Sequence, residues 1–423
     1  MHTPICDAIS LSANGHTLPS GKRVAYQPFY AGPWWSQRGR PGTRACKGRR
    51  ARLRDEPFRR NVCGVWFYRT IPTAVGLPAL PRRRVYSYHD YPAIVCEDIV
   101  RVRRAVARAA IPAKSTDRNL IIGTWNLRKF GAIHRSWEEN SGSPKRNLRA
   151  LAYIAEVVRH FDVIAIQEVL RDTTAVRMLV DEFLGNDWGL ILSDVNAGVK
   201  GLGERLVYLY DRRRVQPSGL AGEIVLPPHK DLGHQEQFDR SPYFVGFRAN
   251  KERFALLTAH IRFGSGPADR RPEIVRFAQF TAAEIRDRAR FAGAEEANLI
   301  VLGDFNIEAR RADDPLFAAF VAAGLMVPEA LRDVRTNYAQ TVKHYDQIAW
   351  FMGDLTLLTN GGAGVIDLRG TVFRELTARQ VTDRVSDHLP LWAEFVIDRS
   401  GHELADQLGL DRDAPDPFVS VPD

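Results

Sequence analysis

The chain has 423 residues, of which 45% are apolar and 26% charged, with a formal net charge of +9. This is the composition of an ordinary globular protein of one or two domains. No apolar run reaches the roughly 18 residues that a membrane span needs. The segment Met1–Ser20 lacks the basic start and apolar core of a secretory signal, so a cytoplasmic location is the default expectation.

The basic charge is concentrated near the N-terminus. Residues 1–118 contain 22 Lys and Arg against 7 Asp and Glu, whereas residues 119–423 contain 37 against 43. All cysteines also lie in the first part, at spacings that match no common zinc pattern. The rest of the chain needs no disulfide, which is compatible with a reducing compartment.

Residues 1–93 form a basic extension rich in Arg, Pro and Gly, without sustained helical or strand periodicity, and are expected to be poorly ordered. Its Arg-rich runs fit a nucleic-acid arm. The favoured alternative is a non-native leader, produced by a start codon placed too far upstream. Residues 94–118 are expected to be a basic helix and linker, because Val95, Ile99, Val102 and Val106 share one helix face.

From Asn119 short apolar strands alternate with amphipathic helices, which predicts two packed sheets with helices outside over residues 119–397. An acidic tail is expected over residues 398–423. Strands are predicted at Leu120–Trp125, Val163–Ile166, Arg205–Tyr210, Phe244–Phe247, Phe254–Ala259, Leu299–Leu302, Gln347–Phe351 and Leu391–Val396. Helices are predicted at Lys145–His160, Thr174–Leu184, Arg271–Arg290 and Pro315–Ala323.

Polar residues follow these strands where they end, and strand ends are where functional sites are usually built. A buried carboxylate needs a partner, because an unpaired buried charge is very costly. Several such ends are better explained by one shared site than by separate caps and turns. The residues concerned are Asn126, Glu168, His260, Asp304, Asn306, Asp346, Asp387 and His388.

The residue types in this set narrow the chemistry. Asp, Glu and Asn are hard oxygen ligands suited to Mg²⁺, with Mn²⁺ or Ca²⁺ as alternatives. Histidines beside such a cation donate and accept protons near neutral pH. With no Ser or Cys nucleophile motif, the set indicates attack by water on phosphorus, with a metal stabilising the developing charge.

Four motifs made of these residues occur in a familiar order. They resemble those of the endonuclease/exonuclease/phosphatase superfamily, and the resemblance implies a four-layer α/β sandwich, two packed mixed β-sheets flanked by helices, with the site at one edge. The motifs are Thr124-Trp125-Asn126, Gln167-Glu168-Val169, Gly303-Asp304-Phe305-Asn306 and Ser386-Asp387-His388.

Within that superfamily the chain most resembles the deoxyribonuclease I branch. Gly203-Glu204-Arg205 is similar to a segment whose Glu pairs with a catalytic His, here His260, and Asp346 stands where an Asp orients the second His, here His388. The resemblance implies catalytic roles for His260, His388, Glu204, Asp346, Asp304 and Asn306. It implies metal ligands at Glu168, Asp387, Asn126 and Asp304, and substrate contacts from Arg240 and Asn126. Which histidine is acid and which is base stays open.

Some positions depart from that branch. Gln347 replaces the Arg of its Tyr-Asp-Arg-Ile motif, and Leu202 stands where a DNA-contacting Tyr is usual. These changes put minor-groove binding in doubt more than hydrolysis. The expectation is a monomeric, metal-dependent phosphodiester hydrolase, a DNase I-like endonuclease with DNA as its partner.

Other functions remain open beside it. One alternative is a phosphatase or phosphodiesterase for a small phosphorylated or lipid substrate, although the Trp-Cys-Asp-Arg motif of phosphoinositide phosphatases is missing. Abasic-site endonucleases generally have Tyr at the position of His260 and rank low. A second alternative is a catalytically degenerate binding module, against which the retention of every expected metal and histidine position argues.

Overall fold

The computed structural model describes residues 84–139, 141–196, 203–227, 236–286, 298–351, 355, 362–412, 414 and 416–422. Most of the expected N-terminal extension and Leu202 therefore lie outside the described residues. Within the described part of the chain, no helix combines the length and apolar character needed to cross a membrane.

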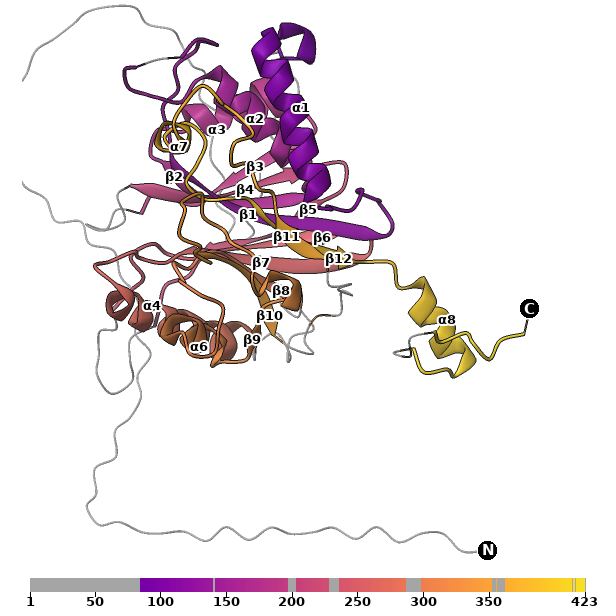
Figure 1. The fold of residues 1–423 in the computed structure, drawn as a ribbon. Coiled ribbons are helices and arrows are strands. Elements are labelled where there is room, and N and C mark those ends of the chain that lie inside the picture. The colour runs from indigo at the N-terminus through magenta and orange to yellow at the C-terminus, as the bar shows by residue number, and fades with distance from the viewer. Residues whose placement is uncertain are drawn as a thin grey trace, which may run out of the picture. The chain divides into compact units, whose positions relative to one another are not determined.

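Two six-stranded sheets form the centre of the fold (Figure 1). The first has the order β11-β12-β1-β2-β4-β3 and the second β5-β6-β7-β8-β10-β9. All neighbours are antiparallel except β1 with β2 and β7 with β8, which are parallel. The strands of the first sheet are β1 (Asn119–Phe130), β2 (Val163–Leu170), β3 (Trp188–Leu192), β4 (Glu204–Asp211), β11 (Ala363–Val365) and β12 (Leu391–Val396). Those of the second are β5 (Gln216–Glu223), β6 (Tyr243–Ala249), β7 (Glu252–His260), β8 (Leu299–Asp304), β9 (Leu325–Met326) and β10 (Asp346–Phe351).

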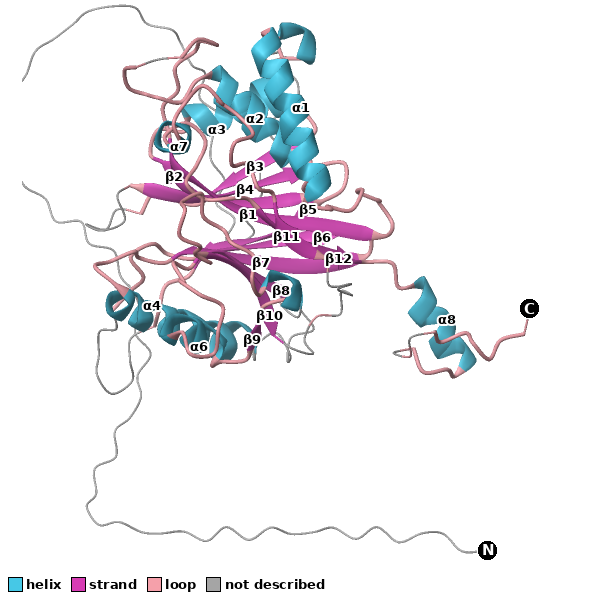
Figure 2. Cartoon of the chain, in the orientation of Figure 1, coloured by secondary structure: helices cyan, strands magenta, loops and turns pink. Residues whose placement is uncertain are grey.

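Helices cover the outer face of each sheet (Figure 2). Over the first sheet lie α1 (Ala93–Arg108), α2 (Leu148–Val158), α3 (Thr174–Met178) continuing as a π-helical turn over Leu179–Leu184, and α7 (Ala378–Thr382). Over the second lie α4 (Pro267–Phe280), which continues over Thr281–Arg286, and α6 (Pro315–Val321). The remaining helical segments are Tyr88–Asp90, Glu329–Leu331 and α8 (Ser400–Leu408).

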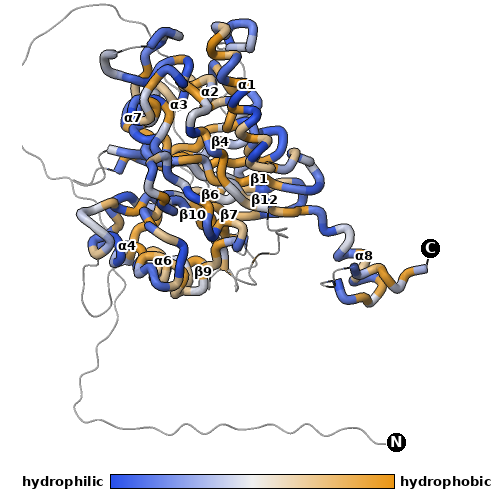
Figure 3. Tube along the Cα trace, in the orientation of Figure 1, coloured by the Kyte–Doolittle hydropathy of each residue, from blue (hydrophilic) through white to orange (hydrophobic). Residues whose placement is uncertain are grey.

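Alternating side chains of the strands divide the interior into three apolar cores. In β1, Leu120 and Ile122 join the core between the sheets, whereas Ile121 joins the core under α1 and α2. In β7, Leu256 points to the core between the sheets and Leu257 to the core under α4 and α6. Both faces of these strands are buried, which is why they are apolar for most of their length (Figure 3). Three cores between four layers confirm the expected sandwich.

The segment before Asn119 packs against this unit. The apolar face of α1 joins the first core, and Asp98 on the same helix accepts hydrogen bonds from Tyr153 of α2 (2.7 Å) and from the backbone of Phe373 (3.2 Å). Tyr91, just before α1, is buried in the same core. The expected boundary at Asn119 remains a proposal about where the catalytic unit starts, and residues 84–118 pack against that unit.

Every strand and helix predicted in the central region is present, with boundaries shifted by a few residues. The last residues of the predicted helix Arg271–Arg290 lie outside the described part of the chain. The strands that the sequence did not predict are β3, β5, β9 and β11. β5 is an exposed edge strand containing Pro217 and Gly219, so its extended state comes from pairing with β6 and leaves no alternating pattern in the sequence.

Candidate active site

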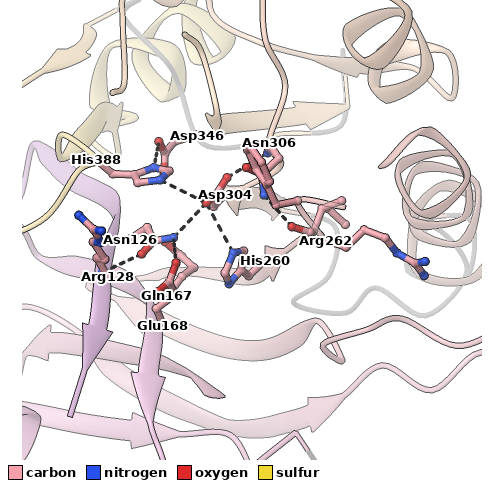
Figure 4. A network of polar contacts seen from close by, with 12 residues as sticks. Asn126, Arg128, Gln167, Glu168, His260, Arg262, Asp304, Asn306, Asp346 and His388 are labelled. Atoms are coloured by element: carbon pink, nitrogen blue, oxygen red, sulfur yellow. Dashed lines mark hydrogen bonds and ion pairs between the residues drawn. The ribbon is translucent and has the colours of Figure 1, made fainter. Parts of the chain in front are cut away.

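The parallel strand pairs of the two sheets bring their carboxyl ends to one place. In the first sheet Asn126 lies opposite Gln167, and in the second His260 lies opposite Asp304. The side-chain amide of Asn126 donates a hydrogen bond of 3.0 Å to Asp304 across the sandwich. Polar ends from both sheets therefore form a single site (Figure 4).

Asp304, at the end of β8, is the centre of this site (Figure 4). Its Oδ2 accepts the hydrogen bond from Asn126 and lies 3.7 Å from Nε2 of His260 and 3.6 Å from Nε2 of His388. Its Oδ1 accepts a hydrogen bond of 2.9 Å from the backbone of Asn306. Burial would raise the pKa of Asp304, but the charges of both imidazoles and these hydrogen bonds lower it. Asp304 is thus the shared neighbour of both histidines.

The glycine before Asp304 is required by the close approach of β7. Gly303 has φ +140°, and a Cβ atom there would lie 2.1 Å from the carbonyl oxygen of Ala259. No other residue fits this position without moving the strand. The Gly-Asp sequence therefore sets how near Asp304 comes to His260.

Glu168 is held by the loop that follows Asn126. Asn126 Nδ2 donates to Glu168 Oε1 (3.0 Å), and the backbone N–H of Lys129 donates to Oε2 (2.9 Å). Glu168, Asn306, Arg128 and Lys129 all have left-handed backbones, with φ of 59°, 53°, 40° and 49°. Non-glycine residues seldom adopt this conformation, and it concentrates at functional sites. The strained backbone directs the Glu168 carboxylate toward the Asn126 amide.

The first histidine pair consists of Glu204 and His260. His260 Nδ1 lies 3.0 Å from Glu204 Oε2, and the guanidinium of Arg240 donates to both carboxylate oxygens, at 2.5 Å from Nε and 3.1 Å from Nη2. All three side chains are buried. Burial would raise the pKa of Glu204, but hydrogen bonds and charge from His260 and Arg240 lower it to about 2. Arg240, expected to contact substrate phosphate, is instead paired with Glu204.

The second histidine pair consists of Asp346 and His388. His388 Nδ1 lies 2.9 Å from Asp346 Oδ2, and both side chains are buried. Burial would lower the pKa of His388, but the charges of Asp346 and Asp304 outweigh it and raise the pKa to about 10. Burial raises the pKa of Asp346. The Oδ1 atom of Asp346 is buried and has no hydrogen-bond partner among the residues the structure describes.

Each pair joins the two sheets. Glu204 lies in β4 of the first sheet and His260 in β7 of the second. Conversely, Asp346 starts β10 of the second sheet, and His388 lies in the loop that leads into β12 of the first. Both expected pairings are therefore confirmed, and each depends on how the sheets are docked.

The family is identified by the sequence of this region. Residues 123–388, which contain every candidate site residue, match the model of the Endonuclease/Exonuclease/phosphatase family. The chain belongs to this family. It is therefore a metal-dependent phosphoesterase. No curated protein matches the chain.

Solved structures of family members share low identity with this one. A family protein from Bacteroides thetaiotaomicron is 17% identical over 68% of this chain and 99% of its own, with a TM-score of 0.44. A mannosyl-6-phosphatase of the same species is 17% identical over 66% and 99% (TM-score 0.43), and D. rerio TDP2 with a single-strand DNA product is 15% identical over 66% and 98% (TM-score 0.42). Likenesses this weak indicate no substrate.

The residues present fit the divalent cation that the family uses. Ligand atoms of Asp304, Asp346 and His388 all lie within 4.8 Å of one another. The partnerless Oδ1 of Asp346 is a buried acceptor of the kind that a cation or water satisfies. Hard oxygen atoms dominate the site, as Mg²⁺, Mn²⁺ and Ca²⁺ require.

The expected set of ligands is brought together only in part. Glu168 and Asp304 accept hydrogen bonds from the same amide of Asn126, so these three side chains are neighbours. Asp387 is half-exposed, and its carboxylate lies 3.6 Å from the guanidinium of Arg128. In the part of the chain that the structure describes, Asp387 does not join the group around Asp304.

The sequence did not reveal a buried arginine that joins two loops of the site by hydrogen bonds. Arg146, 4% exposed, donates to the carbonyl oxygens of Leu127, Arg128 and Lys129, at 2.7 to 3.1 Å, and of Arg384 and Val385, at 2.8 and 3.0 Å. The first three follow Asn126, and the other two precede Ser386. Burial lowers the pKa of Arg146 to about 10. The sequence could not indicate this role, because every residue has a backbone carbonyl and the partners of Arg146 are therefore not marked by residue type.

Two further buried side chains support the site. Gln167, read only as part of a motif, donates 3.0 Å hydrogen bonds to Thr124 of the first sheet and Thr258 of the second. Arg310 donates to the carbonyl oxygen of Asp346 (2.7 Å) and to the side chain of Gln347 (2.8 Å). Asn306, expected to be catalytic, donates its own amide to the Ile261 carbonyl.

Proposed function

We propose that the chain is a divalent-metal-dependent endonuclease that hydrolyses DNA phosphodiesters in the manner of the deoxyribonuclease I branch. The observation that supports this most is the convergence of two carboxylate-held imidazoles on one Asp304 oxygen, at 3.7 and 3.6 Å. Two positioned proton-transfer groups suit the cleavage of a diester, in which water must lose a proton while an alkoxide leaves. The site is complete within one chain, so the proposed unit is a monomer.

The two histidines divide the proton transfers. One accepts a proton from the attacking water and the other donates a proton to the leaving oxygen. In each, Nδ1 faces its carboxylate, which leaves Nε2 toward Asp304 and the reaction centre. Glu204 and Asp346 act by fixing ring orientation and tautomer.

The oxygen ligands hold the cation in this proposal. Glu168, Asn126 and Asp304 form one side of the site. Asp387 joins them in this proposal when its carboxylate moves away from the guanidinium of Arg128. Mg²⁺ is the proposed ion, with Mn²⁺ or Ca²⁺ as alternatives. When bound, it stabilises negative charge on the phosphoryl and leaving oxygens.

Asn306 and Arg240 are assigned supporting roles. The backbone of Asn306 donates to Asp304 Oδ1 and its amide is occupied by Ile261, so Asn306 positions Asp304. Arg240 neutralises Glu204, and its part in substrate contact is proposed to be indirect, through His260.

The test is a substrate panel with matched variants. Purified protein is incubated with Mg²⁺, Mn²⁺ or Ca²⁺ and with plasmid DNA, RNA, an inositol phosphate or sphingomyelin. Nicking of the plasmid is expected from wild type and is expected to disappear in Glu168→Gln. Turnover of a small phosphate or lipid ester with intact plasmid would replace the endonuclease by the phosphatase alternative. Absence of turnover with every substrate and metal would favour a degenerate binding module.

A further inference from the structure

A cavity lined by arginines adjoins the candidate active site. Its volume is about 870 Å³, and it shares Arg128 and Asp387 with the site. The far wall is formed by the segment that includes α7. The charged residues that line it are Arg128, Arg369, Arg374, Arg379 and Asp387, and the aromatic ones are Tyr338 and Phe373.

Two of these arginines have no side-chain partner in the part of the chain that the structure describes. Arg374 and Arg379 are exposed, and their guanidinium groups make no hydrogen bond or ion pair with any residue the structure describes. Arg369, by contrast, is paired with Asp367 at 2.5 Å. Unpaired guanidinium groups beside a phosphoesterase site attract phosphate and are preorganised to bind it by a planar fork of donors.

Arg128 connects the cavity to the site. Its Nη1 donates to Thr382 (2.9 Å) on the cavity side, while its Nε lies 3.6 Å from Asp387. A ligand that fills the cavity and contacts Arg128 is thus also next to Asp387. The cavity is therefore placed where it could hold part of a substrate whose reacting group lies beyond Asp387.

The spread of charge favours a repeated anion over a single phosphate. Four arginines line the cavity; Arg369 is paired with Asp367 and Arg128 lies near Asp383 and Asp387, which leaves the charges of Arg374 and Arg379 for two successive phosphates. The half-buried rings and chains of Tyr338 and Leu376 give an apolar wall for a sugar or base. The volume falls within the usual range of ligand sites, about 300–1,000 Å³.

We propose that this cavity binds the nucleic-acid strand flanking the scissile phosphate, with Arg374 and Arg379 contacting backbone phosphates. The proposal rests on the endonuclease function proposed above and names where its substrate lies. Residues remote from the cleaved bond thereby select a polyanionic strand over a small phosphate ester.

The test measures DNA binding separately from cleavage. Anisotropy of a short labelled duplex, in EDTA so that no metal-dependent cleavage occurs, is recorded with wild type, Arg374→Ala/Arg379→Ala and Arg374→Lys/Arg379→Lys. The alanine variant is expected to bind about tenfold more weakly, and the slope of log K against log salt is expected to fall by about 1.8, or 0.9 for each lost phosphate contact. The lysine variant should restore most of the affinity, because its charge is retained.

Arg332→Ala is the matched control, since Arg332 is an exposed arginine that lines a separate hollow of about 430 Å³. Unchanged DNA affinity in the alanine variant, or an equal loss in Arg332→Ala, would overturn the proposal. So would an equal rise in KM for bis(p-nitrophenyl) phosphate, or a loss of binding to anionic lipid vesicles without a loss for DNA. If wild type binds DNA through these arginines but does not cleave it, the proposed endonuclease function is wrong. The assignment of the cavity as a DNA-binding site is then retained.

Discussion

The two histidine pairs have the same geometry and different surroundings. The distance from carboxylate to Nδ1 is 3.0 Å in the first pair and 2.9 Å in the second. Glu204 of the first pair also receives two hydrogen bonds from Arg240. Asp346 of the second pair has one oxygen bound to His388 and the other without a partner among the described residues.

The comparison shows that the same carboxylate–imidazole geometry can occur with different numbers of neighbouring charges. In the first pair the Glu204 carboxylate has two cationic neighbours, and hydrogen bonds and charge from His260 and Arg240 outweigh burial and lower the pKa of Glu204 to about 2. In the second the nearest cation is the imidazole itself, and the pKa of His388 rises to about 10. The resemblance to the family predicted both histidine–carboxylate pairs. It could not predict the difference in their charged neighbours, because that difference depends on Arg240 pointing toward Glu204.

Asp304 is the residue common to both pairs, so changing it is expected to have the largest effect. Asp304→Asn keeps the shape but removes the charge that both imidazoles face. We expect hydrolysis to fall by more than about 10⁴-fold, the upper end of what one acid or base contributes. The rate of plasmid nicking measures this, with the circular dichroism spectrum as the check on folding. Substantial turnover by a folded Asp304→Asn protein would break the shared-centre description.

Removing one histidine at a time tests each pair separately. His260→Ala and His388→Ala are each expected to lower the rate by about 10²- to 10⁴-fold. Because the proposed cation is held by oxygen ligands and not by an imidazole, both variants should retain Mn²⁺ binding in calorimetry.

The matched carboxylate variants provide the control for this comparison. Glu204→Gln and Asp346→Asn impair orientation without removing an imidazole, so each should cost less than its histidine variant. A near-normal rate in His260→Ala would leave a one-histidine site. Loss of Mn²⁺ binding in His388→Ala alone would move the cation toward the second pair.

Arg146 holds both the loop after Asn126 and the loop before Ser386, and a smaller effect is expected there. Arg146→Lys keeps the charge but cannot reach five carbonyl groups. We expect Mn²⁺ affinity or kcat to drop by about 10- to 100-fold, the usual effect of residues that orient metal ligands. Calorimetry and steady-state kinetics measure the two quantities.

Arg149→Lys is the matched control for Arg146. Arg149 is also 4% exposed, but it pairs with Asp98, Glu139 and Glu375, none of which is a candidate site residue. It should lose stability without losing Mn²⁺ affinity. If the two variants differ from wild type only in thermal stability, Arg146 has no role in positioning the site.

The sequence predicted the two packed sheets with their helices and most of the residues that surround Asp304. Long apolar strands such as β1 and β7 were found because burial on both faces leaves a continuous apolar run. Glu204 and His260 were paired through family motifs alone. Arg146 and Arg310 were missed because they bind carbonyl oxygens, and the pairing of Arg240 with Glu204 was missed because a motif does not say which way a guanidinium turns.

The last prediction concerns acid stability of the first pair and should have the smallest effect at neutral pH. The folded pKa of Glu204, about 2, lies below its ordinary 4.5, so its charge stabilises the fold above pH 4.5 and this contribution is lost as the pH falls toward 2. Between pH 5 and pH 3 the free energy of unfolding should drop by roughly 2 kcal/mol more in wild type than in Glu204→Gln. Urea unfolding across that range measures it. The exposed Glu403→Gln should follow wild type, and parallel curves for Glu204→Gln would show that Arg240 does not stabilise the Glu204 charge.

The way each pair spans the sandwich also affects how activity returns during refolding. Glu204 and His260 are 56 positions apart in the chain, Asp346 and His388 are 42 apart, and within each pair the partners come from opposite sheets or their adjoining loops. Each pair can form only once the two sheets have docked, whereas pairings within the first sheet already join residues as far apart as Asn119 and Val396. An intermediate with both sheets formed but not yet docked would have no aligned imidazole. Recovered hydrolysis is therefore a kinetic marker for sheet docking, distinct from the earlier return of secondary structure.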